Sequence, residues 1–311
     1  MQKILITFPD GNKQKFNEGI TGYEIAKTIS NSLAKKAIAV KLNGEVKDVS
    51  YPIVLDSKFE ILKIEDEEAL ELIRHDCAHV MAEAVQELFP GTQVTIGPAI
   101  KDGFYYDFYR DDPFTLDDLK SIEKKMHHII NKNEKFIREV WDRNDAIKYF
   151  KNIKELYKAE IIKDLPEDEN ITIYKQGNWM DLCRGPHLPS TKHIGKAFKL
   201  MKVSGAYWRG DSSNVMLTRI YGTAWRNFDE LDSYLKQLEE AEKRDHRKIG
   251  KELQLFTFDD EIGAGLPLWL PNGAIIVDQL EKLAKETEDY LDYSRVRTPH
   301  ITKGSLYEKS G

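Results

Sequence analysis

The sequence is poor in cysteine, has no long apolar run and shows no excess of basic residues. Only two cysteines, Cys77 and Cys183, occur among 311 residues, which excludes a framework of disulfide bridges and favours a reducing compartment. No apolar stretch approaches the roughly 18 residues that span a bilayer, and residues 4–8 are too short for a signal peptide. The sequence therefore predicts a cytoplasmic protein without a membrane-spanning segment.

Charge is nearly balanced, with 46 Lys and Arg against 52 Asp and Glu and a formal net charge of −6. This excludes a protein that coats nucleic acid by overall positive charge, so any contact with nucleic acid has to be local. The hydrophobic fraction of 41% supplies ample core material, which excludes a disordered or collagen-like chain. The length suggests about two to three domains.

The start of the sequence has the pattern of a small mixed domain. Residues 2–8 alternate between apolar and polar, and a turn signal at Asp10 and Gly11 predicts a hairpin with the residues that follow. Thr21 and Glu24 form a capping-box pattern that predicts the start of a helix. Further short strands are expected at residues 37–42, 46–48 and 59–64. A ββαββ unit of this size is a candidate for the β-grasp fold.

The remainder of the sequence predicts further helices and mixed segments. Residues 72–89 predict an amphipathic helix that Pro90 ends, and residues 116–133 predict a second, charged helix. Residues 227–251 predict one long charged helix with a narrow apolar stripe, which suits a helix that bridges domains. The expected domains are residues 1–64, 65–225, a linker helix over 226–245, and 246–311.

Two histidines stand four residues apart on the helix expected over residues 72–89. His75 and His79 would lie one above the other on one helix face, a geometry that suits a shared metal ion or a shared proton network. A pair of surface histidines has the same spacing. A zinc-protease interpretation needs a glutamate after the first histidine, and Asp76 stands there instead.

A second segment combines cysteine and histidine. Gly185 and Pro186 prevent a helix between Cys183 and His187, so these two residues are expected on a tight loop that presents both side chains to one point. With the two histidines of the helix they make a four-member set that zinc accepts. The same four could activate water without a metal, because neutral imidazole is a base near pH 7. The residues alone leave both possibilities open.

Glycine, aromatic and basic residues supply further candidates. Gly97 and Tyr106 fall in a strand, turn and strand pattern where they would line a small polar pocket or lie in the core. Residues 196–209 interleave basic with aromatic residues and contain no acid, which suits an unstacked RNA end and also a half-exposed strand. The candidate RNA-binding residues are Lys196, Lys199, Lys202, Tyr207, Trp208 and Arg209.

Six segments occur in one order along the chain: RHDCAH, IGPAIKDGFYYDF, DLCRGPH, KLMKVSGAYWRGD, RIYGTAW and EEAEKRDHRKIGKEL. In this order they resemble bacterial threonyl-tRNA synthetase, and the resemblance spans essentially the whole chain. It implies an α+β, multidomain fold with a β-grasp (ubiquitin-like) TGS domain and an α+β editing domain. A linker helix and an incomplete class II synthetase antiparallel-sheet domain are implied to follow.

The resemblance implies that the parent enzyme attaches threonine to tRNA(Thr) with ATP and hydrolyses mischarged Ser-tRNA(Thr). Serine lacks one methyl group of threonine, which a synthetic site can use for only about 1–3 kcal/mol, so hydrolysis of the wrong ester is needed. The residues implied for the editing cleft are His75, His79, Lys158, Asp181, Cys183 and His187, and those implied to line its pocket are Gly97 and Tyr106. The resemblance favours a cleft without metal.

The last residues resemble only the start of a class II catalytic core. Tyr293, Val296 and Pro299 are similar to motif 1, a strand at the dimer interface, with Asp292 where many members carry glycine. No counterpart of motifs 2 and 3 occurs before Gly311, so this chain is expected to lack the ATP and threonine sites. Zn²⁺ and ATP with Mg²⁺ are expected for the full-length protein, as is a homodimer, but no cofactor for this chain.

Three other interpretations stay open from the sequence. The chain could deacylate Ser-tRNA(Thr) in trans as a stand-alone protein, or it could be a non-enzymatic RNA-binding module built on the TGS domain. A zinc hydrolase on other substrates is the third. The identity of the general base is also left open between the histidines and Lys158.

Overall fold

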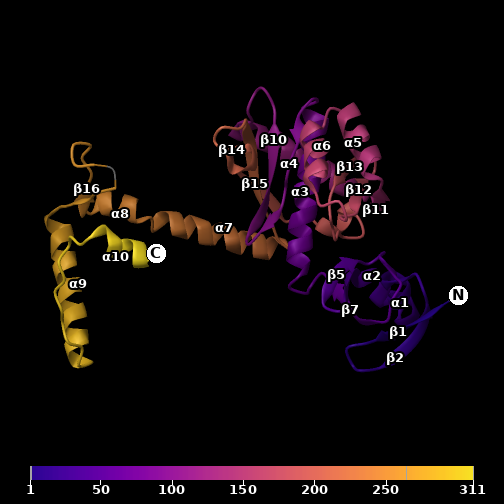
Figure 1. Ribbon diagram of the computed structural model, residues 1–311, viewed down its shortest axis with the longest axis horizontal. Helices are drawn as coiled ribbons and strands as arrows, with labels where there is room; N and C mark the ends of the chain where they lie inside the picture. The colour runs from indigo at the N-terminus through magenta and orange to yellow at the C-terminus, as the bar shows by residue number, and fades with distance from the viewer. Residues whose placement is uncertain (1, 264, 311) are drawn as a thin grey trace. The chain divides into compact units, whose positions relative to one another are not determined.

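The computed structural model describes residues 2–263 and 265–310. The chain divides into two compact units, Met1–Tyr234 and Leu235–Gly311, which are described separately. The larger unit holds the β-grasp sheet and two further sheets with the helices that cover them (Figure 1). None of the helices in the described ranges is long and apolar enough to cross a membrane.

The first sheet has the strand order β2-β1-β7-β4-β5, and only its β1–β7 pair is parallel. Its strands are β1 (Lys3–Thr7), β2 (Lys13–Asn17), β4 (Ala37–Leu42), β5 (Glu45–Asp48) and β7 (Ser57–Lys63). Helix α1 (Gly22–Ile29) begins at the predicted capping box, because Glu24 N–H donates to Thr21 Oγ1 over 3.3 Å and Thr21 N–H donates to the Glu24 carboxylate over 2.9 Å. The predicted β-grasp arrangement is therefore confirmed. The structure adds α2 (Asn31–Lys36) and the short pair β3 (Ile20–Thr21) and β6 (Pro52–Ile53).

The second sheet has the order β14-β15-β10-β8, with β9 paired to β10. Its strands are β8 (Gln93–Val94), β9 (Ala99–Ile100), β10 (Gly103–Tyr109), β14 (Phe198–Tyr207) and β15 (Met216–Ala224). Helices α3 (Ala69–Leu88) and α4 (Leu116–Lys132) share one hydrophobic core with this sheet. The amphipathic helix predicted over residues 72–89 is instead buried on nearly all sides from Ala69 to Val85, because α4 and the sheet both pack against it.

A third, antiparallel sheet has the order β11-β12-β13. Its strands are β11 (Phe136–Trp141), β12 (Ile171–Gln176) and β13 (Trp179–Leu182), and its helices are α5 (Arg143–Asn152) and α6 (Leu156–Asp164). The helices and the sheet share a small core around Phe150, Ile162 and Ile173. Strand β13 leads directly into the loop over residues 183–188, so this sheet fixes where the loop begins.

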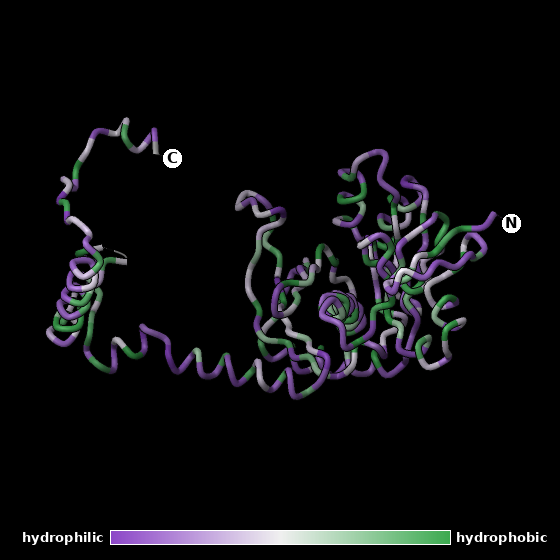
Figure 2. Tube along the Cα trace, turned by 90° about the horizontal axis from the view of Figure 1, so that it is seen from below, coloured by the Kyte–Doolittle hydropathy of each residue, from purple (hydrophilic) through white to green (hydrophobic). Residues whose placement is uncertain are grey.

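The long helix predicted over residues 227–251 is in fact two helices. Helix α7 (Phe228–Lys243) ends, and α8 (His246–Glu252) begins after Asp245, whose carboxylate accepts a hydrogen bond from Arg247 N–H over 2.8 Å. An aspartate at this position caps a new helix instead of continuing the old one. Hydrophilic residues predominate along α7, in agreement with the narrow apolar stripe (Figure 2).

The smaller unit continues with the pair β16 (Phe256–Thr257) and β17 (Leu268–Trp269) and with the helices α9 (Pro271–Tyr290) and α10 (Gly304–Ser310). The strand predicted around Tyr293, Val296 and Pro299 is not present, since residues 293–299 have no regular secondary structure. A strand needs a neighbour to share its hydrogen bonds, and no strand in the described part of the chain pairs with this segment. The fold class is confirmed as α+β with an incomplete sheet domain.

Candidate active site

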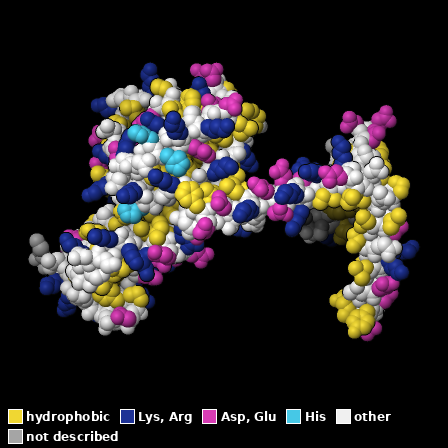
Figure 3. Space-filling model, turned by 180° about the vertical axis from the view of Figure 1, so that it is seen from behind, with side chains coloured by type: hydrophobic (Ala, Val, Ile, Leu, Met, Phe, Trp, Pro, Cys, Tyr) yellow, Lys and Arg dark blue, Asp and Glu magenta, His cyan; other side chains and the backbone are white. Residues whose placement is uncertain are grey.

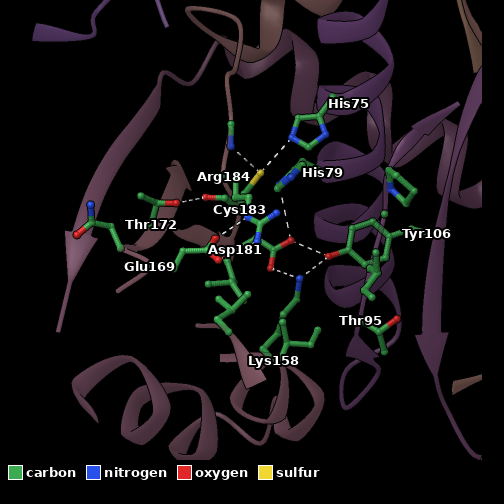
Figure 4. A pocket seen from close by; sticks show the side chains of 18 residues that line it. His75, His79, Thr95, Tyr106, Lys158, Glu169, Thr172, Asp181, Cys183 and Arg184 are labelled. Carbon is green, nitrogen blue, oxygen red and sulfur yellow. Dashed lines mark hydrogen bonds and ion pairs between the residues drawn. The ribbon is translucent and has the colours of Figure 1, made fainter. Parts of the chain in front are cut away.

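A cavity of about 410 Å³ is lined by residues from several separate parts of the larger unit. Helix α3, strand β10, helix α6 and the end of strand β13 each contribute side chains to its wall (Figure 4). The predicted site residues on this wall are His75, His79, Gly97, Tyr106, Lys158, Asp181 and Cys183. His187 is not on the wall but lies in contact with Cys183.

The imidazoles and the thiol form a compact cluster, which we call the histidine–cysteine cluster: His75, His79, Cys183 and His187. The Cys183 sulfur lies 3.0 Å from His75 Nε2 and 3.3 Å from His187 Nε2. One nitrogen or sulfur atom from each of the four residues lies within 4.8 Å of the others. Helical spacing on α3 and the tight loop after β13 thus bring the four predicted residues to one point.

Burial keeps this cluster uncharged at neutral pH. It lowers the pKa values of His75 and His187 to about 4, with the neighbouring His187 charge adding to the shift at His75. It also lowers the pKa of His79 well below its usual range and raises that of the Cys183 thiol to about 12. Neutral imidazoles can accept a proton from water, whereas a thiol with such a pKa is not a thiolate nucleophile.

A second group, the lysine–aspartate–tyrosine cluster, lies beside the first: Lys158, Asp181 and Tyr106. Lys158 Nζ lies 2.5 Å from Asp181 Oδ1 and donates to Tyr106 Oη over 2.9 Å, and the tyrosine hydroxyl donates to Asp181 Oδ2 over 2.6 Å (Figure 4). Burial and the Asp181 carboxylate raise the Tyr106 pKa well above its usual range, so the phenol stays protonated. Asp181 Oδ2 is also 3.7 Å from His79 Nδ1, which links the two clusters.

Gly97 forms a close-packed part of the same wall. A Cβ atom at this position would lie 2.0 Å from Tyr106 Cδ2, far inside van der Waals contact, so the ring packs directly on the glycine backbone. The close approach holds the Tyr106 ring at the back of the cavity. Gly97 therefore contributes to the cavity wall by allowing this close approach of the Tyr106 ring.

The site also contains residues that were not predicted from the sequence. Asp76 lies with Oδ1 2.6 Å from His187 Nδ1 and accepts from Leu188 N–H over 2.9 Å, and burial raises its pKa well above the usual range. Arg184 and Glu169 form a two-bond ion pair, over 2.6 and 2.9 Å, on the cavity lining. The position of Asp76 beside His75 was visible in the sequence, but no pattern connects Glu169 to the loop.

The histidine–cysteine cluster fits zinc in donor type. A tetrahedral zinc ion takes nitrogen ligands at about 2.0–2.1 Å and thiolate at about 2.3 Å. An Asp76 oxygen on the second nitrogen of His187 is the kind of partner that orients zinc ligands. The four donor atoms, spread over as much as 4.8 Å, would have to draw closer around an ion.

The predicted RNA-binding residues do not all face solvent. Lys196, Lys199, Lys202 and Tyr207 are exposed. Trp208 is buried, and Arg209 pairs with Glu160 over 2.9 Å and with Asp164. Arg209 is nevertheless exposed, so Trp208 is the one buried residue among the six predicted ones. On the face seen in Figure 3, basic side chains of the larger unit are interspersed with other types and form no continuous basic patch.

Comparison with known proteins identifies the class. Residues 4–63 match the TGS domain, and residues 171–221 match the threonyl and alanyl tRNA synthetase second additional domain. The β-grasp sheet occupies the first match, and the loop that carries Cys183 and His187 lies in the second. Two segments of the chain are therefore similar to known domains, and one of these domains is described from threonyl and alanyl tRNA synthetases.

The curated relatives that the chain matches are named threonine–tRNA ligases. The chain is 57% identical over 313 residues to the threonine–tRNA ligase of Caulobacter vibrioides (strain NA1000 / CB15N), covering 99% of this chain and 48% of the relative. The threonine–tRNA ligases of Phenylobacterium zucineum (strain HLK1) and Rickettsia rickettsii (strain Sheila Smith) are 54% and 56% identical over 308 residues, with 99% of this chain and 47% and 48% of each relative covered. The chain corresponds to the region of threonyl-tRNA synthetase that carries the TGS and second additional domains, which confirms the predicted resemblance. It spans about half the length of the curated relatives it matches.

Proposed function

We propose that this chain removes serine from mischarged Ser-tRNA(Thr) by hydrolysis, as the editing part of a threonyl-tRNA synthetase. The observation that carries the proposal is one cavity whose wall holds neutral histidines beside a buried lysine and carboxylate. Such a site offers both a proton acceptor and a proton donor within reach of a small ester.

The reaction needs water, one proton acceptor and one proton donor. The water oxygen bonds to the seryl carbonyl carbon while an imidazole, His75 or His79, takes the proton of the water. The resulting tetrahedral intermediate then breaks its bond to the ribose oxygen, which receives a proton from Lys158 or from the imidazolium. Serine and uncharged tRNA are the products. Asp181 holds the Lys158 ammonium and the Tyr106 hydroxyl in place for this step.

Selectivity between serine and threonine follows from the rigidity of the wall. Tyr106 packs on Gly97 with no free space behind the ring, and its hydroxyl is held by Asp181 and Lys158. A wall that cannot move excludes the extra methyl group of threonine, since forcing a methyl group into a packed site costs about 1–3 kcal/mol. Correct Thr-tRNA(Thr) is thereby spared.

The proposal keeps the prediction of a cleft that works without metal. If zinc were bound, His75, His79, Cys183 and His187 would hold it. The ion would then supply Lewis acidity toward a carbonyl oxygen or a bound water. The roles of Asp181, Lys158 and Tyr106 are the same in either case.

tRNA(Thr) is the proposed partner. Lys196, Lys199 and Lys202 and the exposed ring of Tyr207 are retained as RNA-binding candidates because positive charge and aromatic faces suit phosphates and unstacked bases. Trp208 and Arg209 are proposed to act indirectly, by fixing the end of β14 through Glu160 and Asp164.

Further proposals concern the longer protein and its parts. The relatives are named threonine–tRNA ligases, so we propose that the full-length parent joins threonine to tRNA(Thr) with ATP and Mg²⁺, binds Zn²⁺ in its catalytic domain, and acts in the cytoplasm as a homodimer. The division into a TGS domain over residues 1–64, an editing domain over 65–225, a linker helix over 226–245 and a catalytic-domain start over 246–311 is proposed with it.

The test is deacylation of Ser-tRNA(Thr) and Thr-tRNA(Thr) by the 311-residue chain, with and without a strong chelator. We expect loss of serine, retention of threonine and no effect of the chelator. The His79→Ala variant should be inactive, and His128→Ala, which changes an exposed histidine on α4, should behave as the unaltered chain.

Other outcomes point to the alternatives. Hydrolysis that the chelator abolishes would assign zinc to the histidine–cysteine cluster. Tight tRNA binding without any hydrolysis would contradict the proposal and favour a non-enzymatic RNA-binding module. Hydrolysis of unrelated esters but not of Ser-tRNA(Thr) would favour a hydrolase with another substrate.

A further inference from the structure

A carboxyl group of the β-grasp domain reaches the loop of the candidate active site. Asp48 is the last residue of β5, and it is only 7% exposed. Its Oδ1 accepts a hydrogen bond from His187 N–H over 2.6 Å, and its Oδ2 accepts one from the Tyr174 hydroxyl over 2.6 Å. The two oxygens therefore hold the backbone of one site residue and the side chain of a neighbour.

The second of these contacts also acts on the His187 imidazole. The ring of Tyr174 lies 4.1 Å from the His187 ring, centroid to centroid, and Phe136 stacks on His187 at 4.9 Å. Asp76 from α3 lies at Nδ1 of the same imidazole. The position of His187 is thus set by two carboxyl groups, one from α3 and one from the β-grasp domain.

The β-grasp domain packs closely against helix α3. Ile38, Ala39 and Leu62 of its sheet belong to the same buried cluster as Leu72 and Ile73 of α3. Such close packing leaves little room for the two domains to shift against each other. Asp48 consequently presents its oxygens to the loop from a fixed position.

The same strand borders a second cavity next to the site. Val46 lines this cavity of about 400 Å³ together with His75, Gly185 and Pro186. His75 and Gly185 also line the first cavity, so the two cavities adjoin at the loop over residues 183–188, and β5 borders the second of them. Replacement of Asp48 would remove the hydrogen bond that holds the loop at His187.

We propose that Asp48 is a positioning residue for His187, so that the β-grasp domain forms part of the hydrolytic site. The inference rests on the proposed deacylation and names a residue that neither the histidine pattern nor the matched loop contains. Asp48 is not among the residues that line the two cavities described above, so it acts through His187 and Tyr174. Displacement of a site group by about 1 Å can cost on the order of 100-fold in rate.

The kinetic test compares Asp48→Ala with Glu45→Ala in the full 311-residue chain. Glu45 is an exposed acid on the same strand and serves as the matched control. We expect Asp48→Ala to lower kcat for Ser-tRNA(Thr) deacylation roughly 10- to 100-fold, because the hydrogen bonds to His187 N–H of the loop and to the Tyr174 hydroxyl of β12 are both lost. KM should stay near that of the unaltered chain, since no RNA contact is removed. Asp48→Asn, which keeps an acceptor oxygen for His187 N–H, should recover most of the rate.

A second measurement does not depend on hydrolysis. Amide hydrogen exchange in the tRNA-free chain should be roughly 10- to 100-fold faster at His187 and Leu188 in Asp48→Ala, while the amides of β7 stay protected. If the unaltered chain fails to deacylate, the proposed function falls, but the exchange rates still decide whether Asp48 holds the loop.

Two results would overturn the proposal. Unchanged exchange at His187 in Asp48→Ala would show that the loop does not depend on this residue. Equal losses of kcat in Asp48→Ala and Glu45→Ala would indicate a general effect on the β-grasp domain. If Asp48→Ala fails to fold, Tyr174→Phe replaces it: this variant keeps the ring but removes one of the two hydrogen bonds, and it should show a smaller loss of kcat with unchanged KM.

Discussion

Helix α3 carries two pairs of polar side chains on one face, and the two pairs have different surroundings. His75, His79, Glu83 and Gln86 follow one another at helical spacing, so their side chains form a continuous stripe. The first two belong to the histidine–cysteine cluster and line the cavity. The last two lie in a set of side chains that we call the closed network: Glu83, Gln86, Glu155, Gln176 and Trp179.

Most polar atoms of the closed network are hydrogen-bonded within the described part of the chain, although the buried Gln176 Oε1 has no partner there. Gln86 Oε1 accepts from Trp179 Nε1–H over 2.7 Å, and Gln86 Nε2 donates to the Thr92 carbonyl over 2.9 Å and to Glu155. Glu155 also accepts from Val94 N–H over 2.9 Å, and Gln176 donates to Glu83. These bonds tie α3 to β8, to the start of α6 and to the third sheet.

The contrast shows what separates a structural polar cluster from a chemical one. Both ends of the stripe carry polar side chains at helical spacing, and both are buried or partly buried. The two histidines line the cavity of about 410 Å³, whereas Glu83 and Gln86 are not among its lining residues. A proton acceptor at the histidine end can therefore meet a molecule that enters this cavity. At the other end most polar groups are hydrogen-bonded to neighbouring elements of the protein, and these bonds rigidify the wall.

The largest expected contrast is between the deacylation rate and the stability of the fold, when one residue at each end of the stripe is replaced. His79→Ala is expected to lower Ser-tRNA(Thr) deacylation about 10²- to 10⁴-fold, the usual contribution of a general base or acid. Gln86→Ala is expected to leave the rate close to that of the unaltered chain but to cost about 1–3 kcal/mol of stability, because it leaves buried partners unpaired. Single-turnover deacylation and urea unfolding measure the two quantities. A large rate loss in Gln86→Ala would break the distinction.

Replacement of Lys158 should lower both the deacylation rate and the stability of the fold, because Lys158 is buried beside Asp181. Lys158→Met leaves that carboxylate buried without its cation, for which we expect a loss of about 3–5 kcal/mol in the free energy of unfolding. Deacylation should also fall. Lys163→Met, an exposed position on the same helix, is the control. Equal stability of the two variants would show that the Lys158–Asp181 pair does not hold the wall.

The closed network and the histidine–cysteine cluster should contribute to stability with opposite dependence on pH. Burial raises the pKa values of Glu83 and Glu155 from 4.5 to about 7, so their contribution to stability is present below pH 4.5 and is lost as pH rises to about 7. Burial lowers the His75 and His187 pKa values to about 4, so their contribution grows as pH rises from about 4 to 6.5. Each carboxyl shift corresponds to roughly 3 kcal/mol at most.

Urea unfolding between pH 4.5 and 8 tests this opposition. The Glu83→Gln/Glu155→Gln double variant should lose the component of stability that falls with rising pH, and the component from the histidines should remain. Glu67→Gln/Glu71→Gln changes two exposed acids near the start of α3 and serves as the control. Parallel pH profiles for the unaltered chain and the first double variant would contradict the expectation.

The smallest effect is expected at the cavity wall. Gly97→Ala would place a methyl group against the Tyr106 ring, which costs about 1–3 kcal/mol through local displacement. We expect a modest loss of serine hydrolysis and a changed ratio of serine to threonine hydrolysis, since the ring forms the back of the pocket. Gly91→Ala, at a surface turn after α3, tests for a general effect of glycine replacement on stability. An unchanged ratio in Gly97→Ala would remove Tyr106 from the selectivity argument.

Local patterns predicted the parts of the site that depend on one or two segments. Helical spacing placed His75 beside His79, and Gly185 with Pro186 placed Cys183 beside His187. Lys158 and Asp181 came only from the resemblance, because their contact joins α6 to the end of β13 and no local pattern encodes it. Asp48 could not be found at all, since its partner lies 139 residues away in another domain.

The same limit applies outside the site. The charge pattern of residues 196–209 could not show that Glu160 and Asp164, from α6, pair with Arg209. The burial of α3 on both sides depends on α4 and on the second sheet, which form from distant segments. The break before α8 has a local cause instead. Asp245 is a strong helix cap and was visible in the sequence. The long charged pattern of residues 227–251 nevertheless favoured one continuous helix.

Trp179 lies between the two ends of the α3 stripe. Its ring meets His79 edge-on at 5.8 Å, and its indole N–H donates to Gln86. An indole in this position senses both the polarity of the cavity and the integrity of the closed network. With the other four tryptophans replaced by phenylalanine, its fluorescence would therefore report an ester that arrives beside His79, without an added dye.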